Sequence, residues 1–318
     1  MTAHFAAVDW GTSSFRIWLM SQGGQVLAER RSHAGMVHAA ASGASGFADI
    51  LQAHLQAFDA PPSLPVVICG MAGARQGWLE ADYLNVPARL IDIVDRAVRI
   101  DDPQRDIRIL PGIAQRDPER PDVMRGEETQ LLGASDSHSQ SAFFCMPGTH
   151  SKWVQVQSGS VTGFATCMTG ELFSLIRQQS ILQHAMGDID SCAPGNVDFL
   201  AGVRDAFDRP AEFSRLLFSI RAGQLLFASE PERNYARLSG LLIGFEIAGC
   251  LCDAGENTTI HLIASGRLRD LYEAAFSCLG LQFATTDADK AVLTGLFTAA
   301  QKFWPPGILP NNDGSIKT

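Results

Sequence analysis

The sequence predicts an α/β protein with mixed sheets, built from two related halves. A pattern of strand, tight turn and strand occurs at residues 5–20 and again at 142–156. A third short strand follows each time, and helices and further strands come after it. Short hairpins require antiparallel pairing, whereas helical connections allow parallel pairing, so mixed sheets are expected. The sequence has neither a G-x-x-x-x-G-K-[ST] phosphate loop nor a Gly-rich dinucleotide fingerprint, which disfavours the two commonest nucleotide-binding folds.

In the first half, short apolar runs separated by turn residues indicate strands, and apolar residues at helical spacing indicate helices. The pair Pro61-Pro62 ends the first long helix. The expected elements are strands at 5–8, 15–20 and 26–31, a helix over 47–58, a strand at 66–69, a helix over 90–98, a strand at 107–110 and a helix from about 126.

The second half repeats this order. The expected elements are strands at 142–146, 152–156 and 161–166, helices between 172 and 252, a strand at 259–264, a helix over 268–276, a strand at 281–284 and a last helix over 291–300. A polar linker near 135–141 separates the two halves. We therefore expect two domains, 1–134 and 135–318.

The first turn of each half has the chemistry of a phosphate-binding loop. A Gly-Thr turn followed by hydroxyls exposes backbone N–H groups and adds O–H donors. One such turn is more often structural, but a matched pair favours a polyphosphate held between two domains. Lys152 and Arg16 follow the turns and either add positive charge or point to solvent. The predicted phosphate-binding residues are Gly11, Thr12, Ser13 and Ser14 in the first turn and Gly148, Thr149, His150, Ser151 and Lys152 in the second.

Composition narrows the class of partner. The net charge of −9 argues against nucleic acid. No basic, apolar leader opens the sequence, and no run approaches the ~20 apolar residues of a membrane span. The seven cysteines are odd in number and mostly lie among apolar neighbours, as expected of free thiols in the cytoplasm. The expected partners are small molecules, and a homo-oligomer is neither required nor excluded.

Five segments together resemble the 2-dehydro-3-deoxygalactonokinases. They are residues 8–14, 70–78, 124–130, 147–153 and 168–173, and their order covers most of the chain. The runs Gly-Met-Ala-Gly-Ala-Arg-Gln-Gly-Trp and Arg-Gly-Glu-Glu-Thr-Gln are the specific ones. This family belongs to the superfamily of acetate and sugar kinases, heat-shock chaperone ATPases and actin. The resemblance implies two ribonuclease-H-like domains in an actin-like ATPase fold, with ATP in the interdomain cleft.

The resemblance also implies roles for three carboxylates. Asp9, at the end of the first strand, would orient hydrated Mg²⁺ on the ATP phosphates. Similar kinases carry a catalytic Asp after a glycine just before the second meander, which places Glu127 in the role of base. Adjacent helical residues diverge by about 100°, so we expect only one of Glu127 and Glu128 to face the substrate. The alternative is that both merely complement the helix dipole.

The sugar-acid end needs a cation for the carboxylate. Arg75 offers a guanidinium fork, although an arginine here could instead hold its loop in place. Gln76, Trp78 and Gly73 belong to the same loop and are predicted to bind substrate with it, while Thr169 and Glu171 are expected on the opposite wall. Gly266 marks the adenosine turn, which often has two glycines in the superfamily and has one here.

The predicted activity is ATP-dependent phosphorylation of the terminal hydroxyl of 2-dehydro-3-deoxy-D-galactonate. Two alternatives remain. One is a kinase for another substrate, either 2-dehydro-3-deoxygluconate or a neutral sugar, and the other is a nucleotide-switched binding protein of the actin or chaperone type. The residues do not distinguish hydroxyl epimers, which differ by one or two hydrogen bonds.

Overall fold

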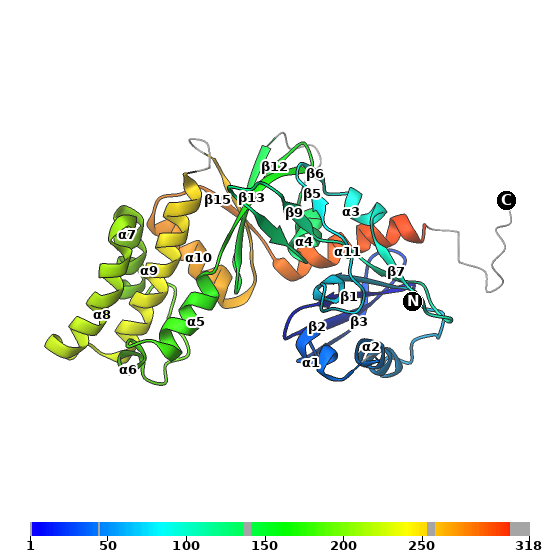
Figure 1. The fold of residues 1–318 in the computed structure, drawn as a ribbon, viewed down its shortest axis with the longest axis horizontal. Helices are drawn as coiled ribbons and strands as arrows, with labels where there is room; N and C mark the ends of the chain where they lie inside the picture. Colours follow the sequence, from blue (N-terminus) through cyan, green and yellow to red (C-terminus); the bar gives the residue numbers. More distant parts are fainter. Residues whose placement is uncertain (1, 44, 136–140, 253–257, 306–318) are drawn as a thin grey trace. The chain divides into compact units, whose positions relative to one another are not determined.

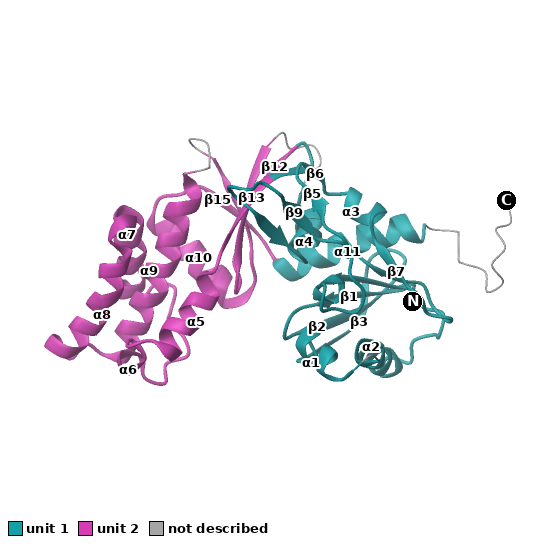
Figure 2. Cartoon of the chain, in the orientation of Figure 1, with its two compact units in different colours: residues 1–139, 158–162, 288–318 teal, residues 140–157, 163–287 magenta. Residues whose placement is uncertain are grey.

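A computed structural model describes residues 2–43, 45–135, 141–252 and 258–305. Two compact units divide the chain (Figure 2). Unit 1 comprises Met1–Ser139, Ser158–Thr162 and Ala288–Thr318, and unit 2 comprises Gln140–Gln157 and Gly163–Asp287. This division differs from the predicted domains in giving the last helix to unit 1. Most of the predicted linker, 136–140, lies outside the described residues.

Unit 1 is built on a six-stranded sheet of order β3-β2-β1-β4-β8-β7 (Figure 1). Pairing is antiparallel from β1 to β2 and from β2 to β3, and parallel from β1 to β4 and from β4 to β8. The strands are β1 Phe5–Trp10, β2 Phe15–Met20, β3 Val26–Ser32, β4 Val66–Gly70, β7 Val98–Ile100 and β8 Ile107–Ile109.

The remaining elements of unit 1 are short, apart from two longer helices. The helices are α1 Met36–Ala41, α2 Gly46–Gln56, η1 Met71–Gly73, α3 Asp92–Asp95, α4 Glu127–Ala134 and α11 Ala288–Phe303. A small sheet joins β5 Leu84–Asn85, β9 Ile113–Gln115 and β10 Asp122–Met124. α11 packs on α4, β1, β4 and α3, which explains why a C-terminal helix belongs to the N-terminal unit.

Unit 2 repeats the sheet and adds a layer of helices. Its strands run in the order β15-β14-β11-β12-β13. They are β11 Ser141–Met146, β12 Ser151–Gln157, β13 Ser160–Cys167, β14 Ile260–Ile263 and β15 Phe283–Thr286, and β6 Ala88–Arg89 pairs with the start of β13. The helices are α5 Thr169–Gln179, α6 Gln183–Met186, α7 Val197–Asp208, η2 Pro210–Glu212, α8 Phe213–Phe227, α9 Pro231–Leu251 and α10 Gly266–Cys278.

The two sheets have the same topology. In each, the first strand of the meander is central, pairing antiparallel with the second strand and parallel with a strand that follows the helices. β1, β2, β3, β4 and β8 therefore correspond to β11, β12, β13, β14 and β15. The predicted duplication and the α/β class with mixed sheets are confirmed.

The predicted helix over 90–98 is wrong. Only Asp92–Asp95 is helical, and the residues on either side form β6 and β7. Val98, which fitted the helical spacing, instead pairs with Ile109 of β8. Pairing with the following strand therefore overrides the helical spacing. Across the described ranges, no helix is both long enough and apolar enough to span a bilayer.

Candidate active site

Asp9 lies on the central strand β1, directly opposite one residue on each neighbouring strand. Its register partners are Arg16 on β2 and Cys69 on β4. Residues paired in this way project from the same face of a sheet. The Arg16 guanidinium donates to the Asp9 carboxylate, and the Cys69 thiol lies 3.8 Å from Asp9 Oδ1. The side chain of Asp9 is 15% exposed, so its carboxylate keeps limited access to solvent.

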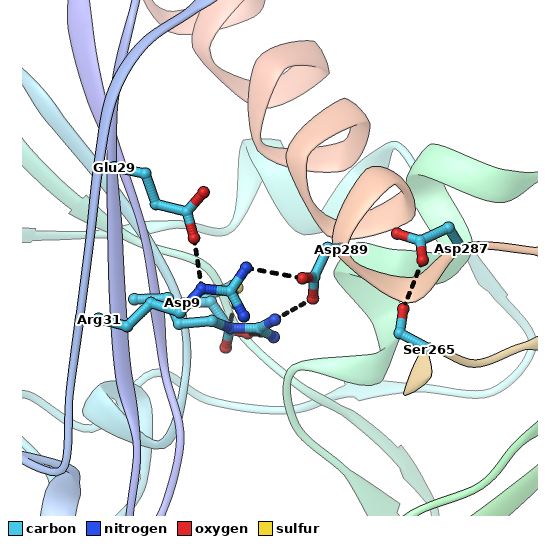
Figure 3. A network of polar contacts seen from close by, with 8 residues as sticks. Asp9, Glu29, Arg31, Ser265, Asp287 and Asp289 are labelled. Carbon is cyan, nitrogen blue, oxygen red and sulfur yellow. Dashed lines mark hydrogen bonds and ion pairs between the residues drawn. The ribbon is translucent and has the colours of Figure 1, made fainter. Parts of the chain in front are cut away.

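Arg16 also contacts the start of α11. Its guanidinium donates to Asp289, which accepts a second bond, 2.8 Å long, from Arg31 (Figure 3). Burial opposes the charge of Arg16, but the carboxylates of Asp9 and Asp289 outweigh it and raise the pKa of the guanidinium. Since Arg16 bonds two carboxylates, the geometry favours a role in orienting Asp9 over direct contact with a phosphate.

The first Gly-Thr turn is supported from behind by the start of α1. The N–H groups of Met36 and Val37 donate to the carbonyls of Gly11 and Thr12 at 2.9 and 3.1 Å. The approach is so close that a Cβ on Gly35 would lie 2.5 Å from the turn backbone. The exposed residues of this turn are Thr12, Ser13 and Ser14.

The second turn is supported in the same way by the start of α5. The N–H of Glu171 donates to the carbonyl of Thr149 at 3.1 Å, and a Cβ on Gly170 would lie 2.6 Å from the carbonyl oxygen of Gly148. In both units the helix after the third meander strand thus packs its N-terminus on the turn. The sequence analysis matched the two turns but did not predict that a helix packs behind each of them. In the sequence this packing is indicated by a glycine at the start of each helix, Gly35 and Gly170.

The predicted residues of the second turn divide into an exposed and a buried group. Thr149 and His150 are exposed, whereas Ser151 and Lys152 are buried. His150 Nε2 contacts the carboxylate of Glu171, so this acidic side chain lies beside the turn. Ser151 Oγ lies 3.3 Å from the hydroxyl of Tyr272.

A buried carboxylate, Glu246 on α9, organises the residues beneath the second turn. It accepts hydrogen bonds from Trp153 Nε1 and the Tyr272 hydroxyl, both at 2.8 Å, and from the hydroxyl of Thr169. Burial raises the pKa of Glu246, although the hydrogen bonds it accepts from Thr169, Trp153, Tyr272 and Ser151 oppose that rise. Sequence reasoning missed this residue, although it is the only acidic side chain in the apolar part of α9 over residues 238–251.

A cavity of about 300 Å³ opens next to the second turn within unit 2. Its volume is at the lower end of the range for small-molecule sites. Gly266, the predicted adenosine residue, begins α10 beside this cavity in a left-handed conformation, with φ +58, which explains why glycine occurs there. The side chains and backbone around the cavity come from Gly148, Thr149, Thr169, Tyr235, Leu242, Ile243, Arg267 and Tyr272, among others.

Two glycines with positive φ lie where separate segments of unit 1 meet beside Asp9. Gly70 ends β4 with φ +88, and a Cβ there would lie 2.6 Å from the carbonyl oxygen of Trp10 and 3.4 Å from Asp9 Oδ1. Gly126 precedes α4 with φ +108, and a Cβ there would lie 3.5 Å from the Cα of Gly70. The end of β1, the end of β4 and the start of α4 therefore converge at one point.

Glu127 and Glu128, the first residues of α4, have different environments. Glu128 is 0% exposed, whereas Glu127 is half-buried, so the two side chains point to different surroundings. Each carboxylate accepts a backbone N–H just before the helix: Glu127 from Arg125 at 3.1 Å, and Glu128 from Gly126 at 2.7 Å. Burial, with the neighbouring charge of Glu127, raises the pKa of Glu128 to about 8. Glu128 is therefore mostly protonated at neutral pH.

The loop after β4 is held by Arg125 and leaves Arg75 exposed. Arg125 Nη2 donates to the carbonyl of Ala81 at 2.9 Å, and its guanidinium lies 4.3 Å from the centre of the Tyr83 ring. A Cβ on Gly73 would lie 2.8 Å from Arg125 Nη1, so glycine makes room for this side chain. No described residue accepts a hydrogen bond from Arg75. An arginine that holds this loop in place was the alternative role for Arg75, and the contacts give that role to Arg125 instead.

The other predicted residues of this loop differ in their surroundings. Gln76 is exposed beside Arg75. Trp78 stacks on Phe47 with ring centres 6.1 Å apart and joins the core of unit 1. Its ring therefore contributes to packing and fixes the end of the loop. The structure places Thr169 and Glu171 with the second turn in unit 2, and Arg75, Gln76 and Gly73 in unit 1.

Comparison with known proteins gives consistent matches along the chain. The family model for 2-keto-3-deoxy-galactonokinase matches residues 9–299. A Rhizobium meliloti (strain 1021) protein named as a 2-dehydro-3-deoxygalactonokinase is 53% identical over 304 residues, covering 95% of this chain and 98% of the relative. The 2-dehydro-3-deoxygalactonokinase of Escherichia coli (strain K12) is 35% identical over 300 residues, covering 94% and 98%.

A solved structure agrees in fold. The crystal structure of a Sinorhizobium meliloti protein assigned to 2-dehydro-3-deoxygalactonokinase superposes with a TM-score of 0.90 at 52% identity, covering 95% of this chain and 99% of that chain.

Proposed function

The chain belongs to the 2-keto-3-deoxy-galactonokinase family, and we propose that it uses ATP to phosphorylate the terminal hydroxyl of 2-dehydro-3-deoxy-D-galactonate. The convergence of Asp9, Gly70, Gly126 and Glu127 in unit 1 is the observation that carries the proposal. Asp9 supplies a carboxylate for a cation, and Glu127 supplies one that can accept a proton. Gly70 and Gly126 have no side chain, so a ligand can approach the backbone closely. The seven cysteines of the protein are free thiols, which suits the reducing cytoplasm, where we place the reaction.

The Gly-Thr turns supply the phosphate-binding groups of the proposal. Their hydroxyls and backbone N–H groups suit the oxygens of ATP. The cavity beside the second turn is proposed for the adenosine. Arg267 lines it, and Gly266 directly precedes Arg267 at the start of α10. The turn residues assigned to phosphate are Gly11, Thr12, Ser13 and Ser14 in the first turn and Gly148, Thr149 and His150 in the second. Ser151 and Lys152 were predicted with them but are buried, and they support the second turn from beneath.

Asp9 is proposed to hold Mg²⁺ through water. The residues fit this ion because Mg²⁺ keeps several waters and uses one or two carboxylates together with substrate phosphates. Among the described residues no cluster of three His, Cys, Asp or Glu side chains could hold a metal alone, which agrees with a site completed by the nucleotide. When bound, the ion would neutralise charge on the phosphates.

Glu127 is proposed as the base. It is half-buried and can reach a ligand, whereas Glu128 is enclosed and mostly protonated. In the reaction the substrate hydroxyl oxygen bonds to the γ-phosphorus, the bond from that phosphorus to the bridging oxygen of ADP breaks, and the hydroxyl proton passes to Glu127. Arg75 would bind the sugar-acid carboxylate through two parallel hydrogen bonds.

A coupled assay of ADP release tests the function, with 2-dehydro-3-deoxy-D-galactonate, its gluconate-derived epimer and neutral sugars as acceptors. We expect the galactonate-derived acid to give the highest kcat/KM and a terminal phosphate ester by mass spectrometry. A preference for a neutral sugar would overturn the acid assignment. ATP hydrolysis that no acceptor changes would indicate a nucleotide-switched protein instead.

Two substitutions test the proposed roles. Asp9→Asn and Glu127→Gln should each lower kcat by about 10²- to 10⁴-fold, the usual contribution of a catalytic carboxylate. Glu80→Gln, which removes an exposed carboxylate in unit 1, is the matched control and should leave kcat unchanged. Near-normal turnover in both test variants would end the proposed mechanism.

A further inference from the structure

Two cysteines of unit 2 that are far apart in the sequence hold their thiols in contact. Cys167 is the last residue of β13, and Cys250 lies in the last turn of α9. Their Sγ atoms are 3.4 Å apart, close enough for one thiol to donate a hydrogen bond to the other. Both residues belong to unit 2 (Figure 2), so the contact lies within one compact unit. The proposed phosphoryl transfer makes no use of either thiol.

The two thiols differ in their access to solvent. Cys167 is half-buried, whereas Cys250 is 6% exposed and belongs to the apolar core of unit 2. The hydrogen bond with Cys167, together with burial, raises the pKa of the Cys250 thiol. Reactive cysteines are partly exposed, whereas buried structural ones are inert. A small oxidant would therefore react first with Cys167, and Cys250 lies where it can react second.

A metal site is the alternative use of neighbouring thiols. Structural zinc sites need four ligands, mostly from cysteine and histidine. Within the part of the chain that the structure describes, no group of three or more His, Cys, Asp or Glu could hold a metal ion. Two thiols in contact are instead the arrangement from which a disulfide forms. Disulfides in cytoplasmic proteins are usually transient, and many of them sense oxidants.

We propose that Cys167 and Cys250 are a redox-sensitive pair, which forms a reversible disulfide with hydrogen peroxide and thereby weakens the binding of ATP beside the second turn. The effect on ATP rests on the proposed function, whereas the formation of the disulfide does not. An S–S bond is about 2.05 Å long, so the two sulfurs must approach each other by about 1.4 Å. The side-chain torsions and the backbone that carries them must supply this movement.

The oxidation proceeds in two balanced steps. The Cys167 sulfur attacks one oxygen of hydrogen peroxide and the O–O bond breaks. The displaced hydroxide takes the thiol proton and leaves as water, and Cys167 becomes a sulfenic acid. The Cys250 sulfur then attacks the Cys167 sulfur, the S–O bond breaks, and the hydroxyl leaves with the Cys250 proton as a second water. The two thiols together lose two electrons, which reduce one peroxide to two waters.

The pair is placed where it can act on the second turn. Cys167 is two residues before Thr169, whose hydroxyl donates to Glu246 on α9. Cys250 lies one helical turn beyond Glu246. The existing hydrogen bond and the proposed disulfide therefore join the same two segments. The next residue, Gly170, packs so closely on the second turn that a Cβ there would lie 2.6 Å from a carbonyl oxygen of the turn, so movement at the end of β13 is passed on to the turn.

The direction of the effect follows from the arrangement of the reduced protein. Thr169 and Gly170 line the cavity proposed for the adenosine. With its cysteines free, the protein supports the second turn through the start of α5, as it supports the first turn through the start of α1. A bridge that draws the end of β13 toward α9 changes both the wall of the cavity and this support. We therefore expect oxidation to weaken nucleotide binding.

Peptide mapping after oxidation tests the disulfide. The full-length protein is treated with hydrogen peroxide, its remaining thiols are blocked, and it is digested without reductant. We expect a pair of peptides linked through Cys167 and Cys250, which dithiothreitol separates. Cys167→Ser and Cys250→Ala should each abolish this link. Cys252→Ser is the matched control, because it removes an exposed thiol at the end of the same helix and should leave the link intact.

Binding of a non-hydrolysable ATP analogue to the reduced and the oxidised protein tests the effect on the site. Oxidised wild type should bind the analogue about 3- to 10-fold more weakly, as expected when one hydrogen bond at the site is lost. Dithiothreitol should restore the affinity. Peroxide should leave the affinity of Cys167→Ser and Cys250→Ala unchanged. Circular dichroism and kinase turnover under reducing conditions verify that each variant is folded.

Three results would overturn the proposal. The first is the absence of a disulfide at peroxide concentrations that oxidise the exposed Cys252, and the second is a bridge from Cys167 or Cys250 to a different cysteine. The third is an oxidised protein that contains the expected disulfide and binds the analogue as tightly as the reduced protein. A reduced wild type that binds no analogue would overturn the proposed function and the effect on ATP with it, while the mapping still decides whether the disulfide forms.

Discussion

A single buried carboxyl group, Glu128, makes the stability of the protein depend on pH. Its pKa is 4.5 in the unfolded chain and is raised to about 8 in the fold. The folded state therefore binds more protons than the unfolded state between these two values. The contribution of Glu128 to stability is therefore fully present below pH 4.5, falls as the pH rises, and is lost above about 8.

Glu128→Gln should remove this dependence. Since one pKa unit corresponds to about 1.36 kcal/mol, the free energy of unfolding of the wild type should fall by on the order of 5 kcal/mol relative to the variant across this range. Chemical denaturation at a series of pH values measures it, with Glu80→Gln as the exposed control. Parallel curves for wild type and Glu128→Gln would show that burial does not disfavour the charged form.

Arg75 should determine affinity for the acid and leave affinity for the nucleotide unchanged. Arg75→Ala removes the charged donor of the sugar-acid carboxylate. A single hydrogen bond to a charged group contributes about 1.5–3 kcal/mol, so KM for the sugar acid should rise by about 10- to 100-fold or more. KM for ATP should not change. Arg120→Ala, an exposed arginine in the same unit, is the control. An unchanged KM for the acid would show that a residue other than Arg75 binds the carboxylate.

At the residue scale, sequence reasoning succeeded where chemistry is local. The separation of Glu127 and Glu128 into an accessible and an enclosed carboxylate follows from helix geometry alone. It failed for Glu246, whose donors Trp153, Thr169 and Tyr272 come from three other elements. Nothing near Glu246 in the sequence indicates that these groups surround it.

At the scale of elements, glycines allow two pairs of helices to pack closely. In unit 1 a Cβ on Gly295 of α11 would lie 2.0 Å from the carbonyl oxygen of Thr129 on α4. In unit 2 a Cβ on Gly240 of α9 would lie 2.1 Å from the carbonyl oxygen of Phe199 on α7. Neither contact leaves room for a methyl group. The start of α4 carries the proposed base, so the first contact also fixes the site.

Gly295→Ala should force α4 and α11 apart. Overpacking of this kind costs about 1–3 kcal/mol or more of unfolding free energy, and the shift of α4 should also lower kcat. Gly249→Ala is the control, because Gly249 lies in α9 with no atom within 4 Å of its Cβ position. That variant should be neutral or slightly stabilised, since alanine favours helix. Equal effects in both variants would show that helix propensity, and not packing, decides the result.

Most strands and long helices were predicted, because their periodicity is local. The two- and three-residue strands of the small sheet, β5, β9 and β10, were not. Elements this short have no periodicity to detect. The helix predicted over 90–98 failed for the opposite reason. Its helical spacing was present, but only Asp92–Asp95 is helical and Val98 pairs with Ile109 of the next strand.

At the scale of the whole molecule, duplication explains the architecture. Each unit has the same strand order, a Gly-Thr turn between the first two strands of its meander, and a helix N-terminus packed behind that turn. The repeat was visible in the sequence, but the assignment of α11 was not. This helix belongs to unit 1 through contacts with α4 and β1, which no local pattern reveals.

The proposed function requires that the turns of both units bind the phosphates of one ATP. Equilibrium binding of a non-hydrolysable ATP analogue and of adenosine tests this directly for Thr12→Val and Thr149→Val, which remove one hydroxyl from each turn. Each substitution should weaken the analogue by about 10-fold or more, as expected for a hydrogen bond to a charged group, and leave adenosine unchanged. The account is contradicted if the substitution in either unit has no effect on the analogue, or if adenosine binding weakens equally.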